Sequence, residues 1–153
     1  KKVVKTIKSN TNSATIKSLK AGSLHNYKVR AYKTVSGKNY YGYYSSTYVN
    51  TACKPKAASI SSLSTKSKTI TAKWKKQSTA TGYQVQYSTS SKFKSAKTVT
   101  VSKNGTLKTT IKKLSKNKKY YVRIRTYKSY KTASGKTAKV YSSWSKSKSI
   151  TCK

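Results

Sequence analysis

The strongest constraint on the fold of this chain is the strict alternation of residue types between Tyr120 and Tyr127. One set of alternating positions holds Tyr120, Val122, Ile124 and Thr126. The other set holds Tyr121, Arg123, Arg125 and Tyr127. Because successive side chains of a β-strand point to opposite faces, this pattern predicts a strand with one buried face and one face in water. The buried face needs a second sheet to cover it, which indicates an all-β architecture.

The charge of the chain is extreme and of one sign. Its 153 residues include 36 Lys and Arg and no Asp or Glu, a formal net charge of +36. Such a charge with modest apolar content is typical of disordered chains, but the apolar residues here are patterned as in strands. We therefore expect a folded protein whose self-repulsion lowers its stability most at low salt. No apolar run in the sequence is long enough to span a membrane.

Because the sequence has no Asp or Glu, catalysis is almost excluded. Paired acid–base groups, Ser-His-Asp triads and oxygen-rich calcium or magnesium sites all rely on Asp or Glu. His25, the single histidine, has no such partner in the sequence. We interpret His25 as a half-buried packing residue rather than a base. The sequence thus predicts a protein that is not an enzyme and that holds no metal or cofactor.

An internal repeat sets the domain organisation. Leu19 corresponds to Leu114 and Arg30 to Arg125, an offset of 95 residues, and Cys53 corresponds to Cys152 at an offset of 99. This period is typical of a β-sandwich domain of about 100 residues. We predict a complete domain over residues 54–153 and the back half of a second domain over residues 1–53, a tandem of one and a half sandwiches.

The predicted complete domain has seven short strands. They are expected at Ile60–Leu63, Thr69–Trp74, Gly82–Tyr87, Lys97–Val101, Thr106–Ile111, Tyr120–Tyr127 and Ala138–Thr151. Lys54–Ala58 contains the only proline and is expected to form the linker before them. Core positions are predicted at Ile70, Ala72, Trp74, Tyr83, Tyr87 and Tyr120.

The predicted half domain matches strands four to seven of the complete one. The matching segments are Lys2–Ile7, Thr11–Ile16, His25–Lys33 and Tyr40–Ala52. Because the chain opens inside the first of these segments, we expect it to be a fragment or a processed product. Four strands leave an apolar face uncovered, which is hard to sustain in water. We expect another chain, such as a second copy, or an upstream segment or a packing neighbour to cover that face.

The two cysteines, Cys53 and Cys152, end the two equivalent last strands. Two cysteines are too few for a disulfide framework or a structural zinc site. In extended tandem domains they lie about one domain length apart, too far for a bond within the chain. The alternatives are an intermolecular disulfide and two unpaired thiols, of which we favour the unpaired thiols.

Three motifs resemble fibronectin type III domains: Trp74-Lys75, GYQVQYS from Gly82, and the L-x5-Y-x-V-x-I spacing from Leu114. The last is similar to the tyrosine corner of that family, in which a buried hydroxyl ties the sixth strand to the loop before it. His25 departs from this pattern at the corner position of the first unit. The chain has no RGD loop, so integrin binding is not implied.

Two longer stretches, YSTSSKFKSAKTVTV and YKTVSGKNYYG, resemble more specific relatives. They are similar to lysine-rich, acid-poor type III repeats near the C-termini of surface proteins of Gram-positive gut bacteria. This resemblance implies an extracellular, envelope-associated module at the cell surface or in the cell wall.

The best candidate for a binding site is a basic and aromatic sheet face. The sandwich architecture places strands three, six and seven in one sheet, whose outer face also carries Gln84 and Gln86. The predicted polyanion-binding residues are Arg123, Arg125, Tyr121 and Tyr127 in the complete domain and Lys28, Arg30 and Tyr32 in the half domain. Tyrosines that we expect to be exposed are Tyr32, Tyr40, Tyr41, Tyr43, Tyr121, Tyr127 and Tyr141.

The alternatives for this face are a solvated surface that lysines keep soluble, ordinary β-propensity of tyrosine, or an aromatic platform for stacking sugars or bases. The unbalanced positive field favours a polyanionic partner. Lysines outnumber arginines 33 to 3, which favours a diffuse attractor of repeating anionic polymers over an arginine-based reader of nucleic acid.

We therefore predict a non-catalytic module that holds a surface protein on anionic cell-wall polymer or acidic glycan. The alternatives are a structural spacer or fibre-forming repeat without a ligand of its own, a non-specific nucleic-acid binder, and an engineered cationic scaffold.

Overall fold

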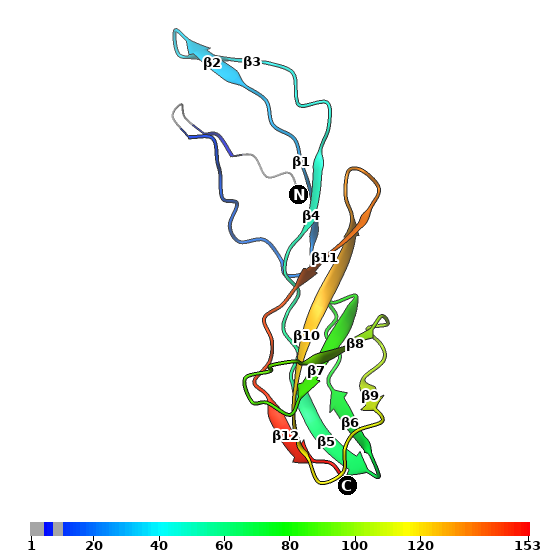
Figure 1. Ribbon diagram of the computed structural model, residues 1–153. Coiled ribbons are helices and arrows are strands. Elements are labelled where there is room, and N and C mark those ends of the chain that lie inside the picture. The colour runs from blue at the N-terminus through cyan, green and yellow to red at the C-terminus, as the bar shows by residue number, and fades with distance from the viewer. Residues whose placement is uncertain (1–4, 8–10) are drawn as a thin grey trace.

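The computed structural model describes residues 5–7 and 11–153. These residues form only strands and irregular segments, so the all-β prediction is confirmed. Within this described part, no helix could cross a membrane. The strands after residue 59 form a two-layer sandwich, and the strands between residues 24 and 52 extend away from one end of it (Figure 1).

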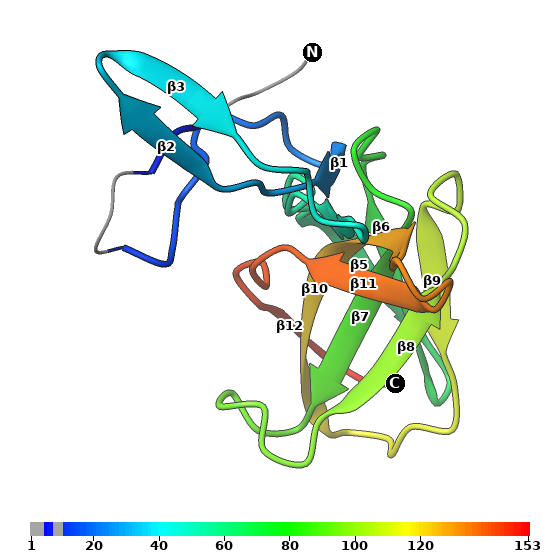
Figure 2. The same cartoon turned by 90° about the horizontal axis from the view of Figure 1, so that it is seen from above.

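The larger sheet of the sandwich contains five strands, whose labels can be followed in Figure 2. They are β7 (Gly82–Ser88), β8 (Lys97–Val101), β10 (Lys119–Lys131), β11 (Thr137–Tyr141) and β12 (Lys148–Thr151). The order is β11-β10-β7-β8, and β12 pairs with β10 further along the same edge as β11. This sheet joins the strands predicted as three, six and seven, and β8 extends it.

The smaller sheet contains β5 (Ile60–Lys66), β6 (Thr69–Trp74) and β9 (Lys108–Ile111) in the order β5-β6-β9. Neighbouring strands in both sheets are antiparallel. The two sheets face each other across one apolar core, as expected for an immunoglobulin-like sandwich.

The core is built from the alternating positions of the central strands. Ile70 and Ala72 of β6 are fully buried, and Trp74 is 3% exposed. Across the interface, two alternating residues of β7 and two of β10 are fully buried as well, namely Tyr83, Val85, Val122 and Ile124. Each large apolar side chain buried in this way contributes about 1.5–3 kcal/mol. The predicted core positions are confirmed; Tyr87 is only half-buried but packs against the same cluster.

The tyrosine corner is present where the leucine-to-tyrosine spacing predicts it. The Tyr120 hydroxyl accepts a hydrogen bond of 3.1 Å from the backbone N–H of Ser115, and both Leu114 and Tyr120 are buried. At the corresponding position of the first unit, His25 is half-buried. Its Nε2 lies 2.7 Å from Ser23 Oγ, and its ring stacks on Tyr27 with centroids 6.0 Å apart.

The first unit has two short strand pairs in place of a sandwich. β1 (Leu24–Tyr27) pairs with β4 (Val49–Ala52), and β2 (Tyr32–Val35) pairs with β3 (Lys38–Tyr41). The predicted continuous strands His25–Lys33 and Tyr40–Ala52 are therefore each broken in two. The predicted last strand Ala138–Thr151 is likewise divided into β11 and β12.

Two further strand predictions for the first unit are wrong within the described residues. Thr11–Ile16 contains no strand. Of the predicted strand Lys2–Ile7, only residues 5–7 are described, and they contain no strand either; the rest of that segment lies outside the described residues. A strand is stabilised by a backbone ladder to a neighbouring strand, and the ladders described in the first unit join β1 with β4 and β2 with β3.

The repeat is nevertheless visible in the backbone geometry of the two units. The N–H of Ser45 donates to the carbonyl of Val29 at 2.8 Å, as Ser145 donates to Ile124 at 2.8 Å. Left-handed residues recur at the same offset of 95, with φ of 60° at Ser18 and 59° at Lys113. The division into a half domain over 1–53 and a complete domain over 54–153 stays a prediction.

The predicted linker, Lys54–Ala58, packs against the sandwich and is not an extended connection in solvent. Pro55 and Ala58 are buried. The carbonyl of Lys56 accepts a hydrogen bond of 2.8 Å from Thr126 Oγ1 of β10, and its N–H donates to Thr79 Oγ1 at 2.9 Å. This segment is therefore part of the edge of the folded domain.

Candidate anion-binding face

The outer face of β10 carries two arginines side by side, two residues apart. Arg123 and Arg125 are half-buried and do not turn into the core. The register of β10 and β7 places Gln86 opposite Arg123 and Gln84 opposite Arg125. Arg123 Nε donates to Gln86 Oε1 at 2.7 Å. Arg125 donates to Gln84 Oε1 through Nε at 2.9 Å and through Nη2 at 2.7 Å.

Aromatic rings lie over both guanidinium groups. Arg123 Cζ lies 3.9 Å from the ring centre of Phe93 and 4.8 Å from that of Trp144. Arg125 Cζ lies 4.4 Å from Trp144 and 4.0 Å from Tyr141. We call these five residues, Phe93, Arg123, Trp144, Arg125 and Tyr141, the cation–π ladder. Each contact of this kind contributes about 0.5–1 kcal/mol when exposed and about 2 kcal/mol when desolvated.

Two serines place Trp144 over the arginines. Between β11 and β12, Ser142 Oγ accepts from the N–H of Thr126 at 3.0 Å, and Ser145 Oγ accepts from the N–H of Ile124 at 3.1 Å. Their own N–H groups donate back to the carbonyls of the same two residues at 3.0 and 2.8 Å. The serine hydroxyls thus replace a strand neighbour, and the connection that carries Trp144 is fastened to β10.

The ladder holds two positive charges close together in partly buried positions. Burial, followed by repulsion from Arg125, lowers the pKa of Arg123. The chain has no carboxylate that could neutralise either arginine. Within the described residues, the Nη groups of Arg123 donate no hydrogen bond to the protein. The ladder therefore offers fixed N–H donors and unbalanced positive charge to an anion.

Tyr121 and Tyr127 flank the arginines on β10 but differ in exposure. Tyr121 is half-buried, and Lys119 Nζ lies 5.7 Å from the centre of its ring. The expectation that Tyr127 is exposed is wrong, since only 3% of it is accessible. Its ring packs against Tyr141, with centroids 6.1 Å apart, and Lys139 Nζ lies 4.8 Å from its centre.

A glycine makes room for the Tyr127 ring. Gly82 lies opposite Tyr127 in the sheet, and a Cβ at Gly82 would lie 2.7 Å from the Tyr127 hydroxyl oxygen and 2.3 Å from the carbonyl oxygen of Val101. Burial, and then the neighbouring Tyr141, raises the pKa of Tyr127. Tyr127 therefore belongs to the packing at the end of the ladder and offers no contact surface.

Of the predicted residues of the first unit, Arg30 forms a smaller copy of the ladder with two tyrosine rings. Arg30 Cζ lies 3.8 Å from the ring centre of Tyr41 and 4.6 Å from that of Tyr44, which correspond to Tyr141 and Trp144. Tyr32 is half-buried beside Tyr41, with ring centroids 6.1 Å apart, and Lys28 is exposed. No glutamine accepts from Arg30 among the described residues.

Sequence reasoning missed Phe93 and Trp144 as members of the site. The Ser-x-x-Ser spacing around Trp144 is the signal that could have identified it, since both serines face the same strand.

Among the tyrosines expected to be exposed, Tyr40, Tyr41 and Tyr43 are 55%, 54% and 101% accessible. Tyr32, Tyr121 and Tyr141 are half-buried.

The two cysteines are free thiols that differ in burial. Cys53 is half-buried, whereas Cys152 is fully buried in the core. A disulfide to another chain through Cys152 would require the core to open. In the described part of the chain, no three His, Cys, Asp or Glu side chains gather in a group that could hold a metal ion.

Comparisons with known proteins bear on the fold and the family. No curated protein matches the sequence. The crystal structure of chicken CNTN1 FN1-FN3 domains is similar at a TM-score of 0.51 and 20% identity, over 83% of this chain and 40% of that chain. This chain thus spans less than half of that structure, and the likeness concerns the fold alone. The family model described as fibronectin type III domain matches residues 54–142, more than half of the chain. The chain therefore belongs to the fibronectin type III family.

Proposed function

We propose that this protein is an attachment module that holds a surface protein on an anionic cell-wall polymer or acidic glycan of a Gram-positive bacterium. Fibronectin type III domains are typically non-catalytic and commonly act as extracellular binding or spacer modules. The proposal adds to this general role a ligand class and a binding face.

The observation that supports the proposal best is the cation–π ladder. Its rings and glutamines hold the two guanidinium groups in place, so an anion does not have to order two long side chains. A polymer with repeating phosphate or carboxylate groups can contact both arginines at once. It would also relieve the repulsion from Arg125, which adds to burial in lowering the pKa of Arg123.

The rest of the chain supplies a diffuse field around this point. The 33 lysines are not balanced by any acidic side chain, so counter-ion release favours every polyanion. In the first unit, Arg30 with Tyr41 and Tyr44 repeats the arrangement on a smaller scale, and Lys28 and Tyr32 lie beside Arg30 in the sequence. Two cationic positions along one chain suit an extended polymer better than a small anion.

A structural spacer is the second candidate, and a specific observation favours it. Both arginines of the ladder already have aromatic and glutamine partners, which explains their positions without any ligand. In this alternative, the lysines only limit sticking to other molecules. Non-specific binding of nucleic acid is a third candidate that rests on charge alone.

The experiment that separates these candidates is a pull-down on purified Gram-positive cell walls, with and without their anionic polymers, over a range of salt concentrations. We expect binding that falls steeply with salt and is lost from the stripped walls. Equal binding to stripped walls would favour the spacer. Binding that discriminates between DNA sequences would favour the nucleic-acid alternative.

Two matched double variants test the face itself. Arg123→Gln with Arg125→Gln removes two charges from the ladder, and Lys73→Gln with Lys108→Gln removes two charges from an exposed cross-strand pair on the opposite sheet. We expect the first pair to weaken binding at least several-fold more than the second. Circular dichroism checks that each variant is folded. A third double variant, Arg123→Lys with Arg125→Lys, keeps the charge while removing the planar donors. Equal effects of all three double variants on binding would contradict a role for the ladder.

A further inference from the structure

Exposed apolar side chains concentrate in the first unit. Among the described residues, all large apolar side chains that are strongly exposed lie between residues 24 and 49, apart from Leu107. Val29 is 73% accessible, whereas its counterpart Ile124 in the second unit is fully buried. Exposed apolar side chains that gather in one unit of a domain are typical of a surface that contacts another segment.

The backbone next to Val29 is also missing a neighbour. In β10, residues Arg123–Thr126 stay in a continuous strand because β7 pairs with them. Their counterparts, Lys28–Ala31, form the gap between β1 and β2. The carbonyls of Val29 and Ala31 accept from Ser45 and Gly42 on one side. Among the described residues, no backbone hydrogen bond joins Lys28 or Arg30 to a neighbour on the opposite edge.

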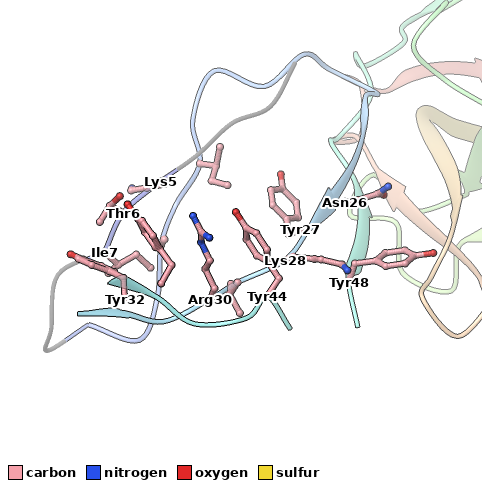
Figure 3. A pocket seen from close by; sticks show the side chains of 14 residues that line it. Lys5, Thr6, Ile7, Asn26, Tyr27, Lys28, Arg30, Tyr32, Tyr44 and Tyr48 are labelled. Carbon is pink, nitrogen blue, oxygen red and sulfur yellow. The ribbon is translucent and has the colours of Figure 1, made fainter. Parts of the chain in front are cut away.

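A groove of about 660 Å³ lies along this open edge. Residues 5–7, residues 26–30 and Tyr32 line it, together with Ala14, Ile16, Tyr41, Tyr44 and Tyr48. Figure 3 shows the Arg30 side chain rising into the groove between Tyr32 and Tyr44. The groove therefore places a cation and several aromatic rings around a backbone edge.

The internal repeat identifies what fills this position in the second unit. At the offset of 95, Lys5 and Thr6 correspond to Thr100 and Val101 at the end of β8. Residues 26–32 correspond to residues 121–127, the part of β10 that pairs with β7. In the complete sandwich, β7 lies between β8 and β10. The groove is thus bounded by the counterparts of the two strands that enclose β7.

We propose that this groove is a strand-acceptor site, which binds one antiparallel β-strand with the chemistry of β7 from a polypeptide outside these 153 residues. Gln84 pairs with Arg125 and Val85 with Ile124, so the added strand would set a hydrogen-bond acceptor side chain opposite Arg30 and an apolar side chain opposite Val29. Main-chain hydrogen bonds give such a complex its affinity, and the alternating side chains give it specificity.

Charge decides against a second copy of this chain as the occupant. Lys5, Lys28 and Arg30 line the groove, and edge-to-edge pairing of two copies would bring like charges together. The β7 strand of a second copy is already held between its own β8 and β10. The occupant is therefore a strand with neutral or acidic acceptor side chains, and glutamine is the residue that the second unit uses.

The test adds a synthetic peptide to the full 153-residue chain. The probe has the sequence TGYQVQYST of residues 81–89, labelled with a fluorophore, and the control peptide carries lysine in place of both glutamines. We expect saturable binding of the probe by anisotropy, at least tenfold weaker binding of the control, and amide exchange at residues 26–32 that slows about tenfold or more.

Variants of the chain test the predicted register. Arg30→Gln should weaken binding of the probe several-fold, while Lys33→Gln, which removes one exposed charge from β2, should not. If Arg30→Gln unfolds the β2–β3 hairpin, Arg30→Lys, which keeps the charge, takes its place in this test. Equal binding of both peptides, no slowing of exchange at millimolar probe, or slowing that appears through self-association without peptide would each overturn the proposal.

Discussion

The cation–π ladder predicts a measurable energetic coupling between Trp144 and Arg125. The Trp144 ring contacts both arginines, with Cζ to ring-centre distances of 4.8 Å for Arg123 and 4.4 Å for Arg125. For half-buried groups, each contact is worth about 1 kcal/mol, between the exposed and desolvated limits. Loss of the half-buried ring adds about 1 kcal/mol of apolar burial. Trp144→Ala should therefore lower the free energy of unfolding by about 2–4 kcal/mol.

A double-mutant cycle isolates the contact itself. Trp144→Ala, Arg125→Gln and the combined variant are compared with the parent chain by urea unfolding, followed by circular dichroism. We expect a coupling energy of about 1 kcal/mol, and Trp144→Phe, which keeps a ring, should recover part of it. Coupling below about 0.3 kcal/mol, the usual error of additivity, would refute the ladder as a stabilising element.

Three further predictions concern single side chains of the sandwich. Tyr120→Phe should lower the free energy of unfolding by about 1–2 kcal/mol in thermal or urea unfolding, because the N–H of Ser115 loses its acceptor; a change near zero would contradict the tyrosine corner. Burial raises the pKa of Tyr127 above 10.0. The stability that its neutral phenol contributes is therefore present below pH 10.0 and is lost as pH rises through the raised folded-state pKa. The variant Tyr127→Phe should lose less stability than the parent chain between pH 10 and pH 11.5, and identical pH profiles would show that this phenol is not linked to folding. In native buffer, Cys53 should react with a thiol reagent faster than Cys152 by about tenfold or more, because Cys152 is fully buried; equal rates would mean that the core opens readily.

Sequence reasoning recovered the sandwich because its signals are local and periodic. The alternation from Tyr120 to Tyr127 gave both faces of β10, and Thr69–Trp74 and Lys97–Val101 match β6 and β8 residue for residue. The tyrosine corner followed from the spacing of Leu114 and Tyr120 alone. In these cases the hydrophobic pattern and the local turn chemistry point to the same structure.

The failures concern features that depend on distant neighbours. Tyr127 has the alternation of an exposed residue, but the space above Gly82 and the ring of Tyr141 bury it. Phe93 joins the ladder from the connection between β7 and β8, and a strand pattern does not predict where such a connection lies. In the first unit, Thr11–Ile16 has a strand-like sequence but forms no strand, so its local preference alone does not produce one.

The central claim is that the arginines of β10 form an outward, anion-binding pair held in place by rings. Nitrogen-detected NMR of the arginine side chains during a titration with inorganic polyphosphate tests this claim most directly, because Arg30, Arg123 and Arg125 give the only guanidinium signals of the chain. The account predicts that the Arg123 and Arg125 signals shift together, saturate at low salt, and return toward their free positions as salt is raised. Shifts confined to lysine signals, with both guanidinium signals unchanged at saturation, would contradict it.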